Sequence, residues 1–144
     1  MLTSLAILGD GSLNRRRLYE LNKTCAADIP DRGEFFTYDE YERRRFLGSS
    51  YRPDGQRVLM DDEDMVGMCV VSYDAKHPWA FIQMTGLLPA YRGRGLARRL
   101  KADALAAAQA WGARTVRTIH HPASTAIIRV NRSLGFRDAA FELG

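Results

Sequence analysis

Apolar side chains recur along this chain with two different spacings, which predict its helices and strands. Residues 65–73 form an almost unbroken apolar run, typical of a buried central strand. Residues 95–111 place apolar side chains every three or four positions and are followed by a glycine, which predicts a long amphipathic helix. The same reasoning predicts helices over 14–27, 38–47 and 124–134, and strands over 2–8, 57–60, 79–88, 115–120 and from 136 onward.

The order of these elements indicates the fold class. Strands follow one another in the middle of the chain and alternate with helices toward its end, which favours an α/β chain with a mixed sheet and helices on both faces. Gly86 interrupts the strand over 79–88 and is a candidate bulge or point of divergence. A length of 144 residues without internal repeats predicts a single domain over residues 1–144.

Composition and charge narrow the possible partners. The chain is 46% hydrophobic and 26% charged, as in ordinary soluble domains, and has no apolar run of the ~20 residues that a membrane span needs. We expect no membrane partner and, without a secretory signal, a cytoplasmic location. The net charge of +4 favours an anionic partner of unspecified kind. Cys25 and Cys69 are expected to be reduced, half-buried core residues, and no metal site is expected.

A glycine-rich turn directly before the long helix carries the clearest chemical signal. Gly93 and Gly95 let the backbone approach a ligand closely, so that several N–H groups point into one concavity at a helix N-terminus. Arg92 and Arg94 add positive charge. The turn predicts a phosphate or pyrophosphate site, with a tight turn that binds nothing as the alternative. It is not a Walker motif, which needs Gly-Lys-Ser/Thr, nor the dinucleotide fingerprint, because Arg98 replaces the third glycine.

Two motifs together resemble the GNAT N-acetyltransferase superfamily. Residues 92–97, Arg-Gly-Arg-Gly-Leu-Ala, resemble its pyrophosphate-binding core Gln/Arg-x-x-Gly-x-Gly/Ala. Residues 131–136, Asn-x-x-Leu-Gly-Phe, resemble its closing Tyr/Asn-x-x-x-Gly-Phe helix end. The order of predicted elements agrees with the GNAT fold over nearly the whole chain. The resemblance therefore implies a mixed, mostly antiparallel sheet with splayed central strands.

The resemblance also implies a reaction. An acetyl group would pass from acetyl-coenzyme A, the co-substrate, to a primary amine of a small molecule or peptide by direct attack in a ternary complex. The coenzyme would enter between the strands that end near residues 88 and 120. Its implied contacts are Gly86, Leu87, Leu88, Arg92, Gly93, Arg94, Gly95, Leu96, Ala97, Ser124 and Asn131.

The acid and base of the family are only partly matched. Many members carry a tyrosine acid where this chain has Asn131, which donates a hydrogen bond but no proton, and a glutamate base where it has Gln83. His120 and His121 titrate near neutral pH and face opposite ways on a strand, and His120 is the favoured base. We therefore take His120 and Asn131 as candidate catalytic residues, with a hydrogen-bonded strand-end histidine as the alternative.

Other interpretations stay open. The missing tyrosine and glutamate are also consistent with an acyl-coenzyme A-binding module of little activity. Arginine clusters at 15–17, 43–45 and 98–99 suggest nucleic acid binding, but such clusters are more often solvated helix faces, so no nucleic acid partner is expected. Aromatic residues at 35–41 indicate either lid packing or a partly apolar acceptor pocket. The identity of the amine and a homodimer through the last strand are undetermined.

Overall fold

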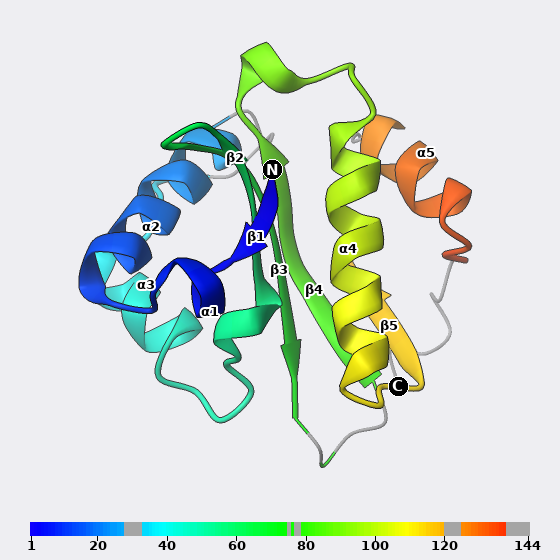
Figure 1. The fold of residues 1–144 in the computed structure, drawn as a ribbon, viewed down its shortest axis with the longest axis horizontal. Coiled ribbons are helices and arrows are strands. Elements are labelled where there is room, and N and C mark those ends of the chain that lie inside the picture. Colours follow the sequence, from blue (N-terminus) through cyan, green and yellow to red (C-terminus); the bar gives the residue numbers. More distant parts are fainter. Residues whose placement is uncertain (28–32, 75, 77–78, 120–124, 138–144) are drawn as a thin grey trace.

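The computed structural model describes residues 1–27, 33–74, 76, 79–119 and 125–137 (Figure 1). Short 3-10 turns, η1 and η2, cover Pro53–Gly55 and Pro89–Tyr91. The helices and strands are, in chain order, β1 (Leu2–Ser4), α1 (Leu5–Leu8), α2 (Ser12–Ala26), α3 (Tyr38–Arg45), β2 (Gln56–Asp61), β3 (Asp64–Tyr73), β4 (Trp79–Leu87), α4 (Leu96–Ala110), β5 (Thr115–Thr118) and α5 (Thr125–Ser133).

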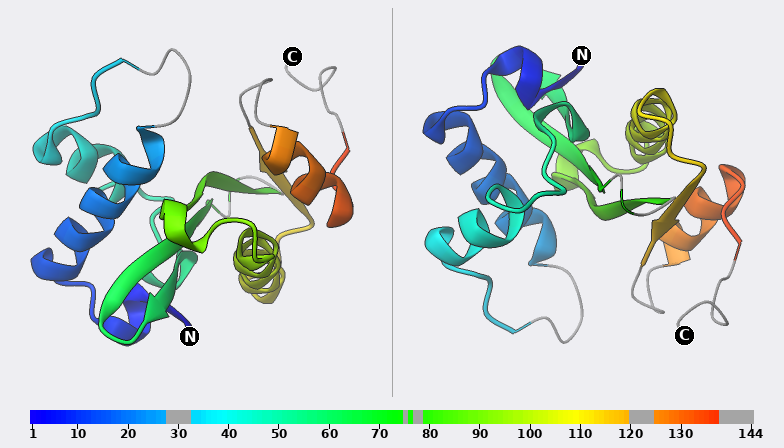
Figure 2. Two further views of the ribbon diagram at one scale, coloured as in Figure 1. Left: turned by 90° about the horizontal axis from the view of Figure 1, so that it is seen from above. Right: turned by 90° about the horizontal axis from the view of Figure 1, so that it is seen from below.

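The described strands form one sheet in the order β1-β2-β3-β4-β5. Successive strands are antiparallel except β4 and β5, which are parallel. α2 and α3 cover one face of the sheet, α4 covers the other, and α5 lies beyond β5 (Figure 2). The predicted mixed, mostly antiparallel sheet with helices on both faces is confirmed. Within the described ranges, no helix is both long and apolar enough to cross a bilayer.

Alternate residues of the central strand supply two separate cores. Met68 and Val70 of β3 face α2 and α3, whereas Cys69 and Val71 face α4. This period of two arises because successive side chains of a strand point to opposite faces of the sheet. Both faces are covered, which explains the almost unbroken apolar run over 65–73.

The α2–α3 side is held by aromatic packing. Tyr19 contacts the rings of Phe35, Tyr38 and Tyr41, with ring centroids between 5.1 and 5.7 Å apart. The Tyr41 hydroxyl is buried and donates a hydrogen bond to Asn22 Oδ1 of α2 at 2.7 Å. These mutual contacts support lid packing as the main role of the aromatic residues at 35–41.

Arginines of the two N-terminal clusters lie over aromatic rings. Arg16 lies over Tyr38 at 4.8 Å from the ring centroid, and Arg45 lies over Tyr41 at 5.0 Å. Cations over ring faces stabilise the packing. The contacts give these arginines a role within the fold itself.

Polar contacts fix α4 relative to the far edge of the sheet. Arg57 of β2 forms a two-pronged ion pair with Asp103 of α4, with N–O distances of 2.6 and 3.1 Å. Trp111, directly after α4, donates from Nε1 to Asp54 at 2.7 Å. Asp103 is the middle residue of α4 and Trp111 follows its last residue, so neither contact involves the N-terminal turns of the helix.

The strand predicted over residues 2–8 is only partly correct, because β1 ends at Ser4 and residues 5–8 form the short helix α1. Leu5 is fully buried, whereas Ile7 is 77% exposed. An apolar run this short does not distinguish a strand from one helical turn. Phe136 and Arg137 are not in a strand, and the rest of the predicted last strand lies outside the described residues. The other described helices and strands agree with prediction within about two residues at each end.

The bulge expected at Gly86 lies instead at Gln83. Val70 pairs with Met84 and Val71 with Ile82, so Gln83 is the extra residue of β4. Gly86 pairs regularly with Met68. Its lack of a side chain serves the packing, because a Cβ here would lie 2.7 Å from the Cβ of Cys25 on α2.

We predict that Gly55→Ala lowers the free energy of unfolding by roughly 1–3 kcal/mol, because the new methyl group has no room. A Cβ at Gly55 would lie 2.2 Å from the carbonyl oxygen of Val71 and 2.9 Å from the Trp111 ring. Gly48→Ala is the control, since a Cβ there meets nothing within 4 Å. Urea denaturation of both variants checks the prediction, and equal midpoints would contradict it.

Candidate active site

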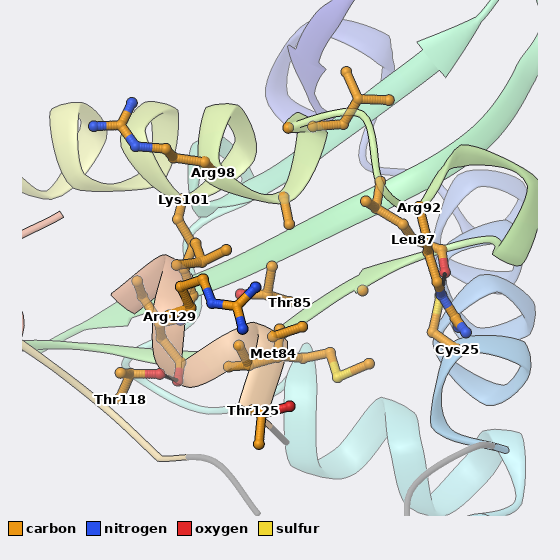
Figure 3. Close-up of a pocket in the computed structure, with 18 of the residues that line it drawn as sticks. Cys25, Met84, Thr85, Leu87, Arg92, Arg98, Lys101, Thr118, Thr125 and Arg129 are labelled. Atoms are coloured by element: carbon orange, nitrogen blue, oxygen red, sulfur yellow. Dashed lines mark hydrogen bonds between the residues drawn. The ribbon is translucent and has the colours of Figure 1, made fainter. Parts of the chain in front are cut away.

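A cavity of about 740 Å³ opens where β4 and β5 separate (Figure 3). Its walls come from residues 83–87 of β4, the following loop, the first turns of α4, the end of β5 and the N-terminal half of α5. Cys25 of α2 also borders it, although α2 lies on the opposite face of the sheet from α4. The cavity is therefore a wedge that runs through the sheet rather than a groove on one face.

The separation of the two strands leaves backbone available on β4. Residues 79–82 of β4 pair with 115–118 of β5, and in the described part of the chain the pairing ends there. Residues 84–87 keep their antiparallel partners on β3, Gln83 is the bulge, and the other edge of residues 83–87 borders the cavity. An extended ligand with amide groups can bind such an edge as an added strand.

The glycine-rich turn forms the second wall as the sequence predicts. Gly93 and Gly95 have φ angles of +79° and +75°, a left-handed conformation that costs least for glycine. Gly95 is the N-cap of α4 and contributes no side chain, so the first N–H groups of the helix are left for another acceptor. These N–H groups and the helix dipole favour an anion at this end of the cavity.

The described residues that line the cavity carry positive charge and include no carboxylate. Arg92 and Arg98 lie near the glycine turn, and their Nε atoms donate to the Leu87 carbonyl and to Ser133 Oγ, each at 3.1 Å. Figure 3 shows Arg129 of α5 extending into the cavity from the opposite side. The electrostatic environment suits a ligand with several negative charges.

Most of the coenzyme-contacting residues expected from the sequence lie together. The cavity-lining ones are Gly86, Leu87, Arg92, Gly93, Gly95, Leu96 and Ala97. Leu88 packs against the core, and the guanidinium of Arg94 lies 5.4 Å from the Tyr91 ring centroid instead of on the cavity wall. His120, His121 and Ser124 lie outside the described residues.

Asn131 lies inside the protein rather than on the cavity wall. It is 4% exposed, and its Oδ1 accepts a hydrogen bond from Lys101 Nζ. Its Nδ2 is buried and has no hydrogen-bond partner among the described residues. Gln83, at the place where many GNAT enzymes carry their base, lies at the bulge and lines the cavity.

Lys101 is a site residue that the sequence reasoning missed. It is 1% exposed and lines the cavity from α4. It lies four residues after Ala97 and three before Ala104, so it continues the helix face that is turned inward. A lysine inside an apolar stripe is an available sequence signal, because lysine is almost never fully buried without a partner.

Comparison with known proteins identifies the family. The chain matches the sequence model of the Acetyltransferase (GNAT) family over residues 15–136. This match covers most of the 144 residues, and the chain belongs to the GNAT acetyltransferase family. No curated protein matches the chain with significant sequence similarity.

Solved N-acetyltransferase structures share the fold. The ribosomal-protein-S18-alanine N-acetyltransferase from Escherichia coli has a TM-score of 0.74 at 16% identity, over 96% of this chain and 78% of that chain. AAC(6')-Iy with a bisubstrate analogue has a TM-score of 0.69 at 19% identity, over 96% and 90% of the two chains. The NatC complex bound to Gag peptide and CoA has a TM-score of 0.71 at 18% identity, over 96% and 85%. The coenzyme or its analogue in these neighbours agrees with acetyl-coenzyme A as co-substrate.

The cavity predicts different reactivities for the two cysteines. Cys25 borders the cavity, whereas Cys69 is fully buried and its burial raises the pKa of the thiol to about 11. A higher thiol pKa means less of the reactive thiolate at pH 8, so we expect Cys25 to react about tenfold faster or more. Labelling of Cys25→Ser and Cys69→Ser by a disulfide reagent separates the two rates, and faster reaction of Cys69 would contradict the geometry.

Proposed function

We propose that this protein transfers the acetyl group of acetyl-coenzyme A to a primary amine of a small molecule or peptide. The observation that carries the proposal is the wedge between β4 and β5, with an anion-binding helix N-terminus at one end. Membership of the GNAT family supports the same conclusion. The neighbours named for ribosomal protein, aminoglycoside and peptide complexes support an amine as the acceptor.

The cavity fits the two recognition features of the coenzyme. The amides of its pantetheine arm would pair with the free edge of residues 83–87, as an added strand does. Its pyrophosphate would accept hydrogen bonds from the N–H groups of residues 93–97, with Arg92 and Arg98 beside it. The absence of carboxylates among the described lining residues removes the repulsion that a phosphorylated ligand would otherwise meet.

The reaction proposed is direct attack within a ternary complex. The amine nitrogen bonds to the thioester carbonyl carbon, the carbon–sulfur bond breaks, and one proton passes overall from the nitrogen to the sulfur. The protein holds the amine and the thioester close together in the reactive orientation, and no nucleophilic serine or cysteine is required. We propose His120 as the base that receives the proton of the amine, and Asn131 as a hydrogen-bonding residue behind the cavity wall.

Gly95→Glu tests the coenzyme site. We expect acetyl-coenzyme A to raise the melting temperature of the wild type and to leave that of the variant unchanged, because a carboxylate would then occupy the pyrophosphate position. Gly112→Glu is the matched control: Gly112 also has a positive φ and open space around it, but lies after the far end of α4. The control should be less stable yet keep the shift. No shift of the wild type at millimolar coenzyme would remove the proposal.

Release of the coenzyme A thiol in the presence of a panel of primary amines tests turnover. We expect the rate with the best amine to rise through a pKa near that of histidine, and His120→Ala to lose this dependence and about 10²-fold or more in rate. A pH profile that is unchanged in His120→Ala would show that the amine arrives deprotonated without a protein base. Coenzyme binding with only background release for every amine would favour the alternative, a binding module of little activity.

A further inference from the structure

Lys101 is a buried cation on the wall of the cavity. Its side chain is 1% exposed, and no ion pair joins its Nζ to a carboxylate of the described residues. Burial without a counter-ion lowers the pKa of the Lys101 ammonium. Such a group is costly for folding, and a packed leucine or methionine would fill the same place without that cost. Its position on the cavity wall points to a role toward a bound ligand.

The surroundings of Lys101 come from three elements and hold it in place. From α5 and the residues that follow it, Asn131 Oδ1 accepts its hydrogen bond and the Phe136 ring centroid lies 5.5 Å from Nζ. From β3, the buried Cys69 thiol is the titratable neighbour. Arg98 of α4 and Arg129 of α5 line the same cavity. In the described part of the chain, the charged groups at this wall are therefore all cationic.

The Asn131 amide provides a second, independent observation. A lysine ammonium only donates hydrogen bonds, so the bond from Lys101 fixes which end of the amide faces it, namely Oδ1. Nδ2 then points elsewhere, and it is buried with no acceptor in the part of the chain that the structure describes. Buried donors are nearly always satisfied in native proteins, so an unsatisfied one on the amide that binds the cavity-lining Lys101 favours an acceptor that the described residues do not supply.

We propose that Lys101 is a catalytic residue whose ammonium faces the coenzyme sulfur and stabilises the thiolate that leaves, with Asn131 as its positioning residue. This inference rests on the proposed function. When the carbon–sulfur bond breaks, the electron pair stays on sulfur, and a proton moves from Lys101 Nζ to the thiolate. The amine nitrogen gives up its proton to the proposed base, His120, which passes it to solvent, and a proton from solvent restores the ammonium. Protons therefore balance: the amine loses one and the thiol gains one.

The placement of Lys101 agrees with this role. It lies six residues after Gly95, a rise of about 9 Å along α4 from the anion-binding turn. Because α4 follows β4 through that turn, this rise runs back along β4 in the direction that a pantetheine arm would take from its pyrophosphate. Lys101 therefore belongs to the wall that the reactive end of the coenzyme would pass.

The pKa of the coenzyme A thiol when bound is the decisive measurement. Coenzyme A is titrated in complex with the wild-type protein, and the thiolate is followed by its ultraviolet absorbance. An adjacent ammonium lowers a thiol pKa, and we expect a decrease of about one unit or more relative to free coenzyme A. Correspondingly, coenzyme A should bind more tightly as the pH rises through this range, whereas S-methyl-coenzyme A, which has no ionisable thiol, should not.

Substitutions of Lys101 separate the effect of its charge from the effect of its packing. Lys101→Met should return the bound thiol to the pKa of free coenzyme A and leave the affinity for S-methyl-coenzyme A within about twofold. Lys101→Arg keeps the charge and should keep a lowered thiol pKa. Lys23→Met, on the exposed side of α2, removes the same net charge and should change neither quantity.

Each outcome decides the proposal. A thiol that titrates in the wild-type complex as it does in free solution overturns the role of Lys101, even if Lys101→Met does not fold. A lowered thiol pKa that persists in Lys101→Met overturns it as well. If both coenzyme A and S-methyl-coenzyme A fail to bind the wild type, the proposed function falls and this inference falls with it. If both bind but the thiol pKa is unshifted, only the inference about Lys101 is lost.

Discussion

The candidate site depends on one constraint: within the described residues, the parallel pairing of β4 and β5 covers only four residues of each strand. On its other edge β4 stays paired with β3 to Leu87, apart from the bulge at Gln83. The strand is therefore held firmly from one side while its second half is uncovered on the other. The glycine turn, α4 and α5 all reach the cavity because this separation leaves room between them.

α4 serves both the core and the cavity, and its sequence shows how. Leu100, Ala104 and Ala108 are fully buried against the sheet, and the small alanines allow close approach. Ala97 and Lys101 belong to the adjoining stripe that lines the cavity. The packing that stabilises the domain thus also holds the two cavity-lining residues in place. The Arg57–Asp103 ion pair fixes the helix that carries them.

The sequence predicts the parts of this structure that long local patterns define. The helix expected over 95–111 and the strand expected over 65–73 differ from α4 and β3 by about one residue at either end. The glycine turn could also be predicted, because two glycines directly before a helix are the local pattern of a turn with positive φ angles. The bulge at Gln83 could not be predicted from the local sequence, because it arises from the register between β3 and β4. Lys101 was missed because an amphipathic helix is recognised by its apolar residues. A single lysine on the apolar face does not change that pattern. The catalytic assignment of His120 is still a prediction.

Within the described residues, β5 is joined to the sheet by four residue pairs with β4. β5 is the last strand of the described sheet, so widening the wedge disturbs one edge ladder and leaves the antiparallel strands β1 to β4 intact. Among the described strand pairs, a ligand that widened the wedge would therefore disturb only the pairing of β4 with β5. A ligand that binds both the β4 wall and the β5–α5 wall of the cavity would connect the C-terminal segment to the rest of the sheet.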